Sequence, residues 1–130
     1  GVPYYNDSKA TNPDSTIKAL EAFDGHIILL AGGHDKMTSL EPMMKLVQAK
    51  ADVLILLGEA KERFYEAAAA AGVVDIRKVE TMDEAVELAY KLAAAPQVVL
   101  LSPACSSYDM FENFPARGCY FKNLVAALPK

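Results

Sequence analysis

The stretch H-I-I-L-L-A-G-G, residues 26–33, decides the fold class of this 130-residue chain. Its apolar part, residues 26–31, is continuous rather than alternating, which is typical of a strand buried on both faces of a sheet. Two more continuous apolar runs follow, at residues 52–57 and 97–101. Strands of this kind occur in parallel sheets that are covered on both faces, so the three runs predict the centre of such a sheet.

Two weaker apolar runs predict strands nearer the sheet edges. Residues 73–79 alternate between apolar and polar side chains, which favours a position near an edge. Residues 2–5 can form a further short strand, and Pro3 confines it to an edge or to a strand start.

Helical signals separate these runs. Asn12 and Pro13 predict the cap and the first residue of one helix, and Thr81 followed by Glu84 forms a capping box for another. Three further helices are predicted: one capped by Thr38 or Ser39 and running to Lys50, one at residues 60–71, and one from Tyr108 or Asp109 to Leu128 that is interrupted near Pro115. Strand and helix alternate throughout. The sequence therefore predicts a single α/β domain, a Rossmann-like, doubly wound, mostly parallel sheet with helices on both faces.

Composition excludes several classes of function. The chain is 52% hydrophobic and 23% charged, like an ordinary globular domain. Its net charge of -4 gives no electrostatic footprint for nucleic acid or anionic lipid. No apolar run approaches the ~20 residues of a membrane-spanning helix, so we expect neither nucleic acid nor a membrane among its partners. Cys105 and Cys119 are expected to be buried thiols rather than a disulfide.

Three polar loops follow predicted strands. They are the N-terminal loop (N-D-S-K-A-T-N, residues 6–12), the glycine loop (G-G-H-D-K-M-T, residues 32–38) and the serine loop (S-P-A-C-S-S, residues 102–107). Ligands of doubly wound domains bind beyond the carboxyl ends of the strands, where such loops meet. Five side chains of these loops can gather at one edge of the sheet and supply two ammonium groups and three hydroxyls: Lys9, Lys36, Thr11, Ser106 and Ser107. This set suits a small dianion, and Asp7 can face a sugar hydroxyl or pair with a lysine.

Other chemistries have little support in the sequence. Neither G-x-G-x-x-G nor the G-x-x-x-x-G-K-[ST] phosphate loop is present, and G-x-S-x-G is missing, so we expect no catalytic serine. Cys105 lacks neighbours that would stabilise a thiolate. No His or Cys pair has metal-ligand spacing, so no metal site is predicted. Two simpler interpretations stay open: the glycine loop as a tight turn with a solvated Lys36, and Ser106 and Ser107 as helix caps.

The same loops carry a resemblance to a known family. Residues 6–12, A-G-G-x-D-K at 31–36 and L-S-P-A-C-x-S-x-D-x-F-x-N-F-x-x-R-G at 101–118 resemble, in this order, motifs of the D-glutamate-adding enzymes of the Mur ligase family. Enzymes of this family have three domains, and the chain resembles the third, a Rossmann-like domain that brings the incoming amino acid. The resemblance implies that residues 1–130 form a single C-terminal domain of a longer ligase, which agrees with the absence of an initiator Met.

The resemblance implies the chemistry of a bacterial, cytoplasmic ligase of peptidoglycan synthesis. In that family ATP phosphorylates the L-alanine carboxylate of UDP-N-acetylmuramoyl-L-alanine, and the amine of D-glutamate attacks the acyl phosphate. ATP and Mg²⁺ are bound mainly by the central domain, and the UDP-sugar is bound by the N-terminal domain. The expected partners of this chain are therefore D-glutamate and those two domains. No cofactor is expected on the isolated domain, which should be inactive alone.

The resemblance also implies roles for single residues. Thr11, Lys36 and Ser107 would clamp the two carboxylates of D-glutamate, and Phe114 would close that pocket.

Two further residues would serve the nucleotide. Lys9 would approach the transferring phosphate as the catalytic cation, and Asp7 would face the nucleotide at its ribose. Three alternatives stay open: the equivalent domain of a sister Mur ligase, that of folylpolyglutamate synthase, and a non-catalytic α/β module that binds small anions.

Overall fold

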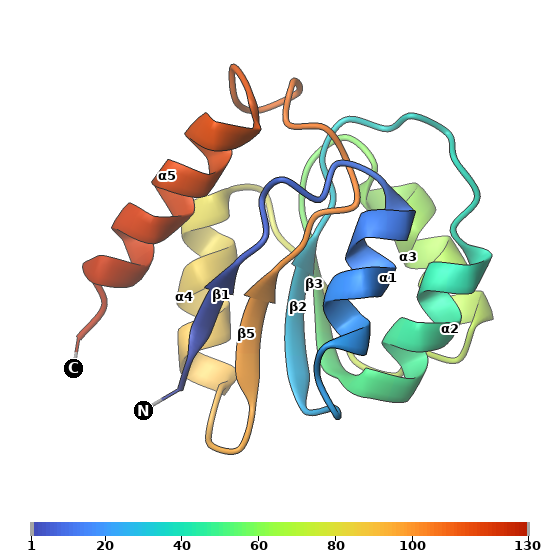
Figure 1. Ribbon diagram of the computed structural model, residues 1–130, viewed down its shortest axis with the longest axis horizontal. Coiled ribbons are helices and arrows are strands. Elements are labelled where there is room, and N and C mark those ends of the chain that lie inside the picture. Colours follow the sequence, from blue (N-terminus) through green and yellow to red (C-terminus); the bar gives the residue numbers. More distant parts are fainter. Residues whose placement is uncertain (1, 130) are drawn as a thin grey trace.

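Five parallel strands form one sheet in the computed structural model, which describes residues 2–129 (Figure 1). Their order across the sheet is β1-β5-β2-β3-β4, and every neighbouring pair is parallel. The strands are β1 (Tyr4–Asn6), β2 (Ile27–Ala31), β3 (Ala51–Leu56), β4 (Ile76–Lys78) and β5 (Val98–Leu101). The predicted Rossmann-like fold class is confirmed.

The three continuous apolar runs form the inner strands, and the two weaker runs form the edges. All five residues of β2 are buried, as expected for a strand covered on both faces. β1 lies at one edge of the sheet, directly after Pro3, and β4 lies at the other edge. Only the middle of the predicted run 73–79 is a strand, because Ile76–Lys78 alone pairs with β3.

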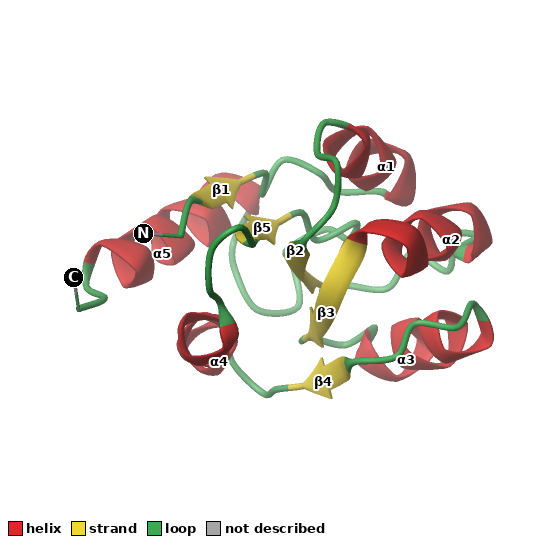
Figure 2. Ribbon diagram, turned by 90° about the horizontal axis from the view of Figure 1, so that it is seen from below, coloured by secondary structure: helices red, strands yellow, loops and turns green. Residues whose placement is uncertain are grey.

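The helices cover both faces of the sheet (Figure 2). They are α1 (Pro13–Glu21), α2 (Glu41–Lys50), α3 (Lys61–Ala70), α4 (Met82–Leu92) and α5 (Phe114–Ala126). Helices α1, α2 and α3 lie on one face, and α4 and α5 lie on the other. Side chains along β2 alternate between two apolar cores, with Ile27 and Leu29 facing the first set of helices and Ile28 and Leu30 facing the second.

Two of the predicted helix starts are confirmed in detail. The side chain of Asn12 accepts a hydrogen bond from the Ser15 amide at 3.0 Å, and Pro13 is the first residue of α1. The hydroxyl of Thr81 likewise accepts from the Glu84 amide at 3.1 Å at the start of α4. At both places the local capping pattern in the sequence was sufficient to predict where the helix begins.

Two other predicted helix starts are wrong. Neither Thr38 nor Ser39 caps α2, because its N-cap is Leu40, whose side chain makes no capping bond in the described structure. Helix α5 begins at Phe114 with Asn113 as its cap, whereas residues 108–113 form turns. A helix running through this segment would place the ring of Pro115 against the carbonyl four residues earlier, so the helix begins at the predicted interruption.

The two cysteines are both free thiols, as predicted, but only Cys105 is buried. Cys119 is exposed because it lies with Tyr120 on the outer side of α5, between the buried residues Gly118 and Phe121. Among residues 2–129, no helix is long and apolar enough to cross a membrane.

Candidate functional site

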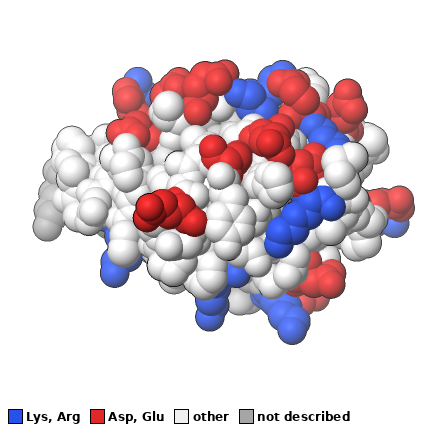
Figure 3. Space-filling model, turned by 90° about the horizontal axis from the view of Figure 1, so that it is seen from above, with Lys and Arg blue, Asp and Glu red and all other residues white. Residues whose placement is uncertain are grey.

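The three polar loops meet beyond the carboxyl ends of β1, β5 and β2, at the top of Figure 1. The amide of His34 in the glycine loop donates to the Ser106 carbonyl in the serine loop at 2.9 Å, and the Gly32 amide donates to Pro103 at 2.9 Å. The N-terminal loop joins the same edge, since the Asp7 amide donates to the Leu101 carbonyl at 2.7 Å. Figure 3 views the molecule from this side, where both acidic and basic side chains reach the surface. The loops therefore form one continuous surface.

Lys36 and Thr11 are brought into direct contact. The ammonium of Lys36 donates to the main-chain carbonyl of Thr11 at 3.1 Å, across two different loops. Lys36 is otherwise exposed and Thr11 is half-buried. An ammonium has three donors, so this contact leaves donors free for a ligand. Lys36 is therefore not only a solvated side chain of a tight turn. Its ammonium is held where the glycine loop meets the N-terminal loop.

The serine loop presents two buried hydroxyl side chains. Ser107 is 2% exposed and Ser106 is 5% exposed. The hydroxyl of Ser106 has no hydrogen-bond partner among residues 2–129, which is a costly state for a buried polar group. Neither serine caps the following helix, because Asn113 does so through a 2.8 Å bond from the Ala116 amide. The cap interpretation of these serines is therefore wrong.

Asp7 is held by a small buried network. Its carboxylate accepts a hydrogen bond from the Ser102 hydroxyl at 2.9 Å. Ser102 in turn contacts the hydroxyl of Thr16 on α1, at 3.1 Å. The exposed Lys9 and Asp7 line one open depression of about 390 Å³, together with Lys18 of α1. Lys9 and Asp7, the two residues predicted to contact the nucleotide, thus line the same depression.

Phe114 lies apart from an enclosed pocket in this structure. It is the first residue of α5, and 43% of it is exposed. Its main-chain carbonyl accepts a hydrogen bond from the Ser8 hydroxyl at 2.8 Å, which ties the start of the helix to the N-terminal loop.

The two glycines of the glycine loop are required by packing within the protein. A Cβ atom on Gly32 would lie 1.9 Å from the Leu57 carbonyl oxygen, and one on Gly33 would lie 2.5 Å from the Ser106 carbonyl oxygen. Their φ angles are +116° and +149°, values that favour glycine. Gly32 and Gly33 therefore serve the tight turn itself, as the simpler interpretation of this loop predicted.

An ionic cluster fixes the base of the glycine loop. Arg63 of α3 donates to both carboxylate oxygens of Asp35, with Nε 2.8 Å from Oδ2. Hydrogen bonding from this guanidinium holds the pKa of Asp35 below its ordinary value. Glu59 accepts from the Asp35 amide at 3.1 Å and lies 3.1 Å from Nδ1 of His34. Sequence reasoning missed Arg63 and Glu59, because isolated charges on a helix and a turn carry no local signal.

The most consequential residue that sequence reasoning missed is Arg117 of α5. It is 3% exposed, and its guanidinium donates to the Ser8 hydroxyl at 2.9 Å, the Ser8 carbonyl at 2.6 Å and the Cys105 carbonyl at 2.9 Å. Burial lowers the pKa of Arg117 to about 10. The only sign of its importance in the sequence was its place in the R-G pair that ends the family motif at residues 101–118.

Cys105 is not an activated thiol, and the described residues 2–129 contain no cluster of metal-ligating side chains. Burial raises the pKa of the Cys105 thiol to about 12, so the thiol is protonated near neutral pH. Among residues 2–129, no group of three or more metal-ligating side chains could hold an ion.

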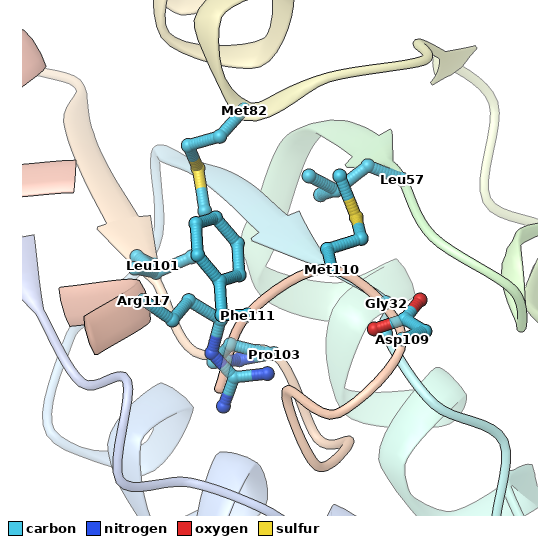
Figure 4. A pocket seen from close by; sticks show the side chains of 10 residues that line it. Gly32, Leu57, Met82, Leu101, Pro103, Asp109, Met110, Phe111 and Arg117 are labelled. Atoms are coloured by element: carbon cyan, nitrogen blue, oxygen red, sulfur yellow. The ribbon is translucent and has the colours of Figure 1, made fainter. Parts of the chain in front are cut away.

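A small cavity under the 108–111 turn is too small for a substrate. It has a volume of about 10 Å³, near the minimum for one water molecule. Figure 4 shows the ring of Phe111 between Met82 and Arg117, with Pro103 close by.

The comparisons with known proteins agree on one family. Residues 1–105 match the family described as "Mur ligase, glutamate ligase domain". The chain is 49% identical over 127 residues to the UDP-N-acetylmuramoylalanine–D-glutamate ligase of Citrifermentans bemidjiense, and 45% identical over 124 residues to that of Clostridioides difficile. These alignments cover 98% and 95% of this chain but 28% of each relative. The chain thus spans less than a third of the length of these curated relatives.

A solved structure shares the fold. The UDP-N-acetylmuramate-alanine ligase MurC of Thermotoga maritima matches with a TM-score of 0.56 and 16% sequence identity. The match covers 91% of this chain and 25% of that one. At this identity the likeness concerns the fold alone.

Proposed function

The chain belongs to the Mur ligase family, to its glutamate ligase domain, and on that premise we propose that it is the D-glutamate-binding domain of an ATP-dependent ligase. The complete enzyme would join D-glutamate to UDP-N-acetylmuramoyl-L-alanine in peptidoglycan synthesis, in the bacterial cytoplasm. The names of the curated relatives support this substrate. Residues 1–130 would be one C-terminal domain that works with an N-terminal UDP-sugar domain and a central ATPase domain.

The contact between Lys36 and Thr11 carries the proposal. The Lys36 ammonium lies 3.1 Å from the main-chain carbonyl oxygen of Thr11, so residues of the glycine loop and the N-terminal loop meet at one point of the surface. Ser107 lies on the neighbouring serine loop, which is bonded to the glycine loop through His34 and Ser106. D-Glutamate has two carboxylates, and each charge-assisted hydrogen bond contributes about 1.5–3 kcal/mol. Lys36, Thr11 and Ser107 would hold them, and the exposed Phe114 would close over the bound amino acid.

Lys9 and Asp7 would act on the nucleotide side of the same surface. The open depression that they line supports this assignment. Lys9 would stabilise negative charge on the transferring phosphate. The bond from Ser102 would fix Asp7 for a contact with the ribose.

The domain would accelerate amide formation by orientation. Clamping both carboxylates leaves the amine of D-glutamate free and in line with the activated carbonyl, which lowers the entropic part of the barrier. The amine attacks the acyl phosphate, and phosphate leaves from the tetrahedral intermediate. By analogy with the family, ATP and Mg²⁺ would be held mainly by the central domain.

A chimera tests the proposed function. This chain would replace the matching region of the Citrifermentans bemidjiense ligase, and phosphate release would be measured with ATP and UDP-N-acetylmuramoyl-L-alanine. We expect release to depend on D-glutamate, with L-glutamate, D-aspartate and diaminopimelate inactive. The intact parent ligase is the positive control.

Two other outcomes would replace the proposal. A preference for another amino acid would assign the chain to a sister ligase or to folylpolyglutamate synthase. An inactive chimera, combined with D-glutamate binding by the isolated chain in an NMR titration, would assign it to the non-catalytic binding modules. An inactive chimera without such binding would refute D-glutamate as the ligand.

A further inference from the structure

Arg117 touches all three loops of the site from below. Its Nε and Nη2 atoms donate to Ser8 in the N-terminal loop, and its Nη1 atom donates to Cys105 in the serine loop. A Cβ atom on Gly33 would lie 3.4 Å from Nη1, so the guanidinium also packs against the glycine loop. No other contact described above joins these three loops through a single side chain.

The bonded residues are close in sequence to three of the predicted ligand contacts, Lys9, Thr11 and Ser107. Ser8 directly precedes Lys9 and lies three residues before Thr11. Cys105 lies two residues before Ser107. The Ser8 hydroxyl, while accepting from Arg117, donates to the carbonyl of Phe114 at 2.8 Å. A shift of Arg117 would therefore move the substrate contacts relative to one another.

Arg117 forms no ion pair within residues 2–129, and the carboxylate of Asp109 acts on its charge only from a longer distance. None of the described ion pairs includes it, and its acceptors are two carbonyls and one hydroxyl. Burying a cation without a counter-ion is expensive, and a neutral side chain of similar length would avoid this cost. The rigid, forked donor geometry of a guanidinium is what allows one side chain to bond acceptors on different segments at once.

We propose that Arg117 is a positioning residue that sets the spacing between the N-terminal, glycine and serine loops, so that their side chains can act on one substrate. The proposal deepens the proposed function and rests on it for the identity of that substrate. Arg117 is not a catalytic residue, because it lies beneath the loops and acts through Ser8 and Cys105.

Hydrogen exchange of the ligand-free chain tests the structural half of the proposal. In Arg117→Met, the amides of Ala10, Gly32 and His34, which bond within and between the loops, should exchange about tenfold faster, as expected for losing one charged hydrogen bond. The amide of Leu54 in β3 should change only as much as global stability changes. Val86→Ala is the matched control, because Val86 is a buried core residue of α4 away from the loops. It should lower global stability without selective loss of loop protection.

Kinetics of the chimera test the functional half. Arg117→Met should raise KM for D-glutamate by about tenfold or more, with KM for the UDP-sugar unchanged. Arg117→Lys should rescue part of the loss, because it keeps the charge but not the fork. Val86→Ala should leave KM for D-glutamate unchanged. If Arg117 only stabilised the fold, Arg117→Met would behave like Val86→Ala and would leave KM for D-glutamate unchanged.

Each remaining outcome decides one question. Unchanged loop exchange and unchanged KM in Arg117→Met would overturn the positioning role, even with an active parent chimera. A parent chimera that does not use D-glutamate would overturn the proposed function, while the exchange data would still decide whether Arg117 holds the loops. If Arg117→Met does not fold, Ser8→Ala decides: it should speed exchange at Ala10 but not at His34, and equal effects at both amides would contradict the proposal.

Discussion

Lys36 is the side chain on which the substrate assignment depends most directly. Its ammonium is exposed and contacts only a main-chain carbonyl in the described structure. Lys36→Ala should therefore leave the free energy of unfolding nearly unchanged while weakening D-glutamate binding by about tenfold or more, the effect of one charge-assisted bond. An NMR titration of the 130-residue chain measures this. Lys45→Ala, which removes an exposed lysine paired with Glu41 on α2, is the control and should bind like the parent.

Gly32 should be the least tolerant position of the glycine loop. In Gly32→Ala the new methyl group would meet the Leu57 carbonyl oxygen at 1.9 Å, so backbone atoms must move. We expect a loss of about 3 kcal/mol or more in unfolding free energy, measured by urea denaturation. Gly72→Ala separates the clash from the backbone strain, because Gly72 has a φ of +89° but its nearest atom would be 3.7 Å away. It should cost about 1–2 kcal/mol, and an equal loss in both variants would refute the steric explanation.

The pair of Asp35 and Arg63 should give stability a specific dependence on pH. The folded-state pKa of Asp35 is lowered, chiefly by hydrogen bonds from Arg63. The pair therefore contributes fully above the ordinary aspartate pKa of about 3.9, and its contribution is lost as pH falls through the lower, folded-state pKa. Arg63→Met should flatten the fall in unfolding free energy below that pH. Arg77→Met, which breaks an exposed pair with Asp75, should leave the slope nearly unchanged.

At the scale of single elements, the helix caps separate what the sequence could predict from what it could not. Thr81 caps α4 through its hydroxyl, whereas Thr38 precedes α2 without capping it. Thr81→Ala should lower the unfolding free energy by about 1 kcal/mol, and Thr38→Ala should change it little. Thermal or urea unfolding of both variants checks this. Comparable losses would mean that α2 starts earlier than the structure shows.

The boundary predictions failed where nonlocal contacts decide the conformation. Asn12 and Thr81 act on amides three residues away, so their patterns are visible in the sequence. The segment from Asp35 to Leu40 instead follows a loop held by Arg63 and Glu59, which lie more than twenty residues away. Arg117 was missed for the same reason. Apart from its place in the family motif, nothing in the sequence around Arg117 distinguishes a buried arginine that bonds Ser8, 109 residues away, from a solvated one.

At the scale of the whole molecule, the continuous strands were the reliable signal. The runs at 26–31, 52–57 and 97–101 became the three inner strands, because burial on both faces leaves a pattern that depends only on composition along the strand. The same strand ends then placed the three loops together. The site assignment needed the family resemblance in addition, because the loops alone predict only a dianion.

The isolated chain should bind its amino acid without turning it over. ATP and the UDP-sugar would be held by the other domains, so no phosphate should be released when the 130-residue chain is mixed with all three substrates. A sensitive phosphate assay checks this, with the chimera as the positive control. Ligation by the chain alone would refute the division of labour among the three domains. Selective NMR shifts with D-glutamate, but not L-glutamate, would show that the amino-acid surface is already formed.

The close packing of glycines beneath the loops has a consequence for inhibition. Side chains at Gly32, Gly33 and Gly58 would each collide with neighbouring backbone, so these positions cannot change without damage to the fold. If a compound bound mainly to the main chain around these glycines, few substitutions there could therefore weaken its binding without damaging the fold. Resistance would have to arise at exposed positions such as Lys36 or Phe114, where, on the proposed function, each substitution would also weaken the binding of D-glutamate.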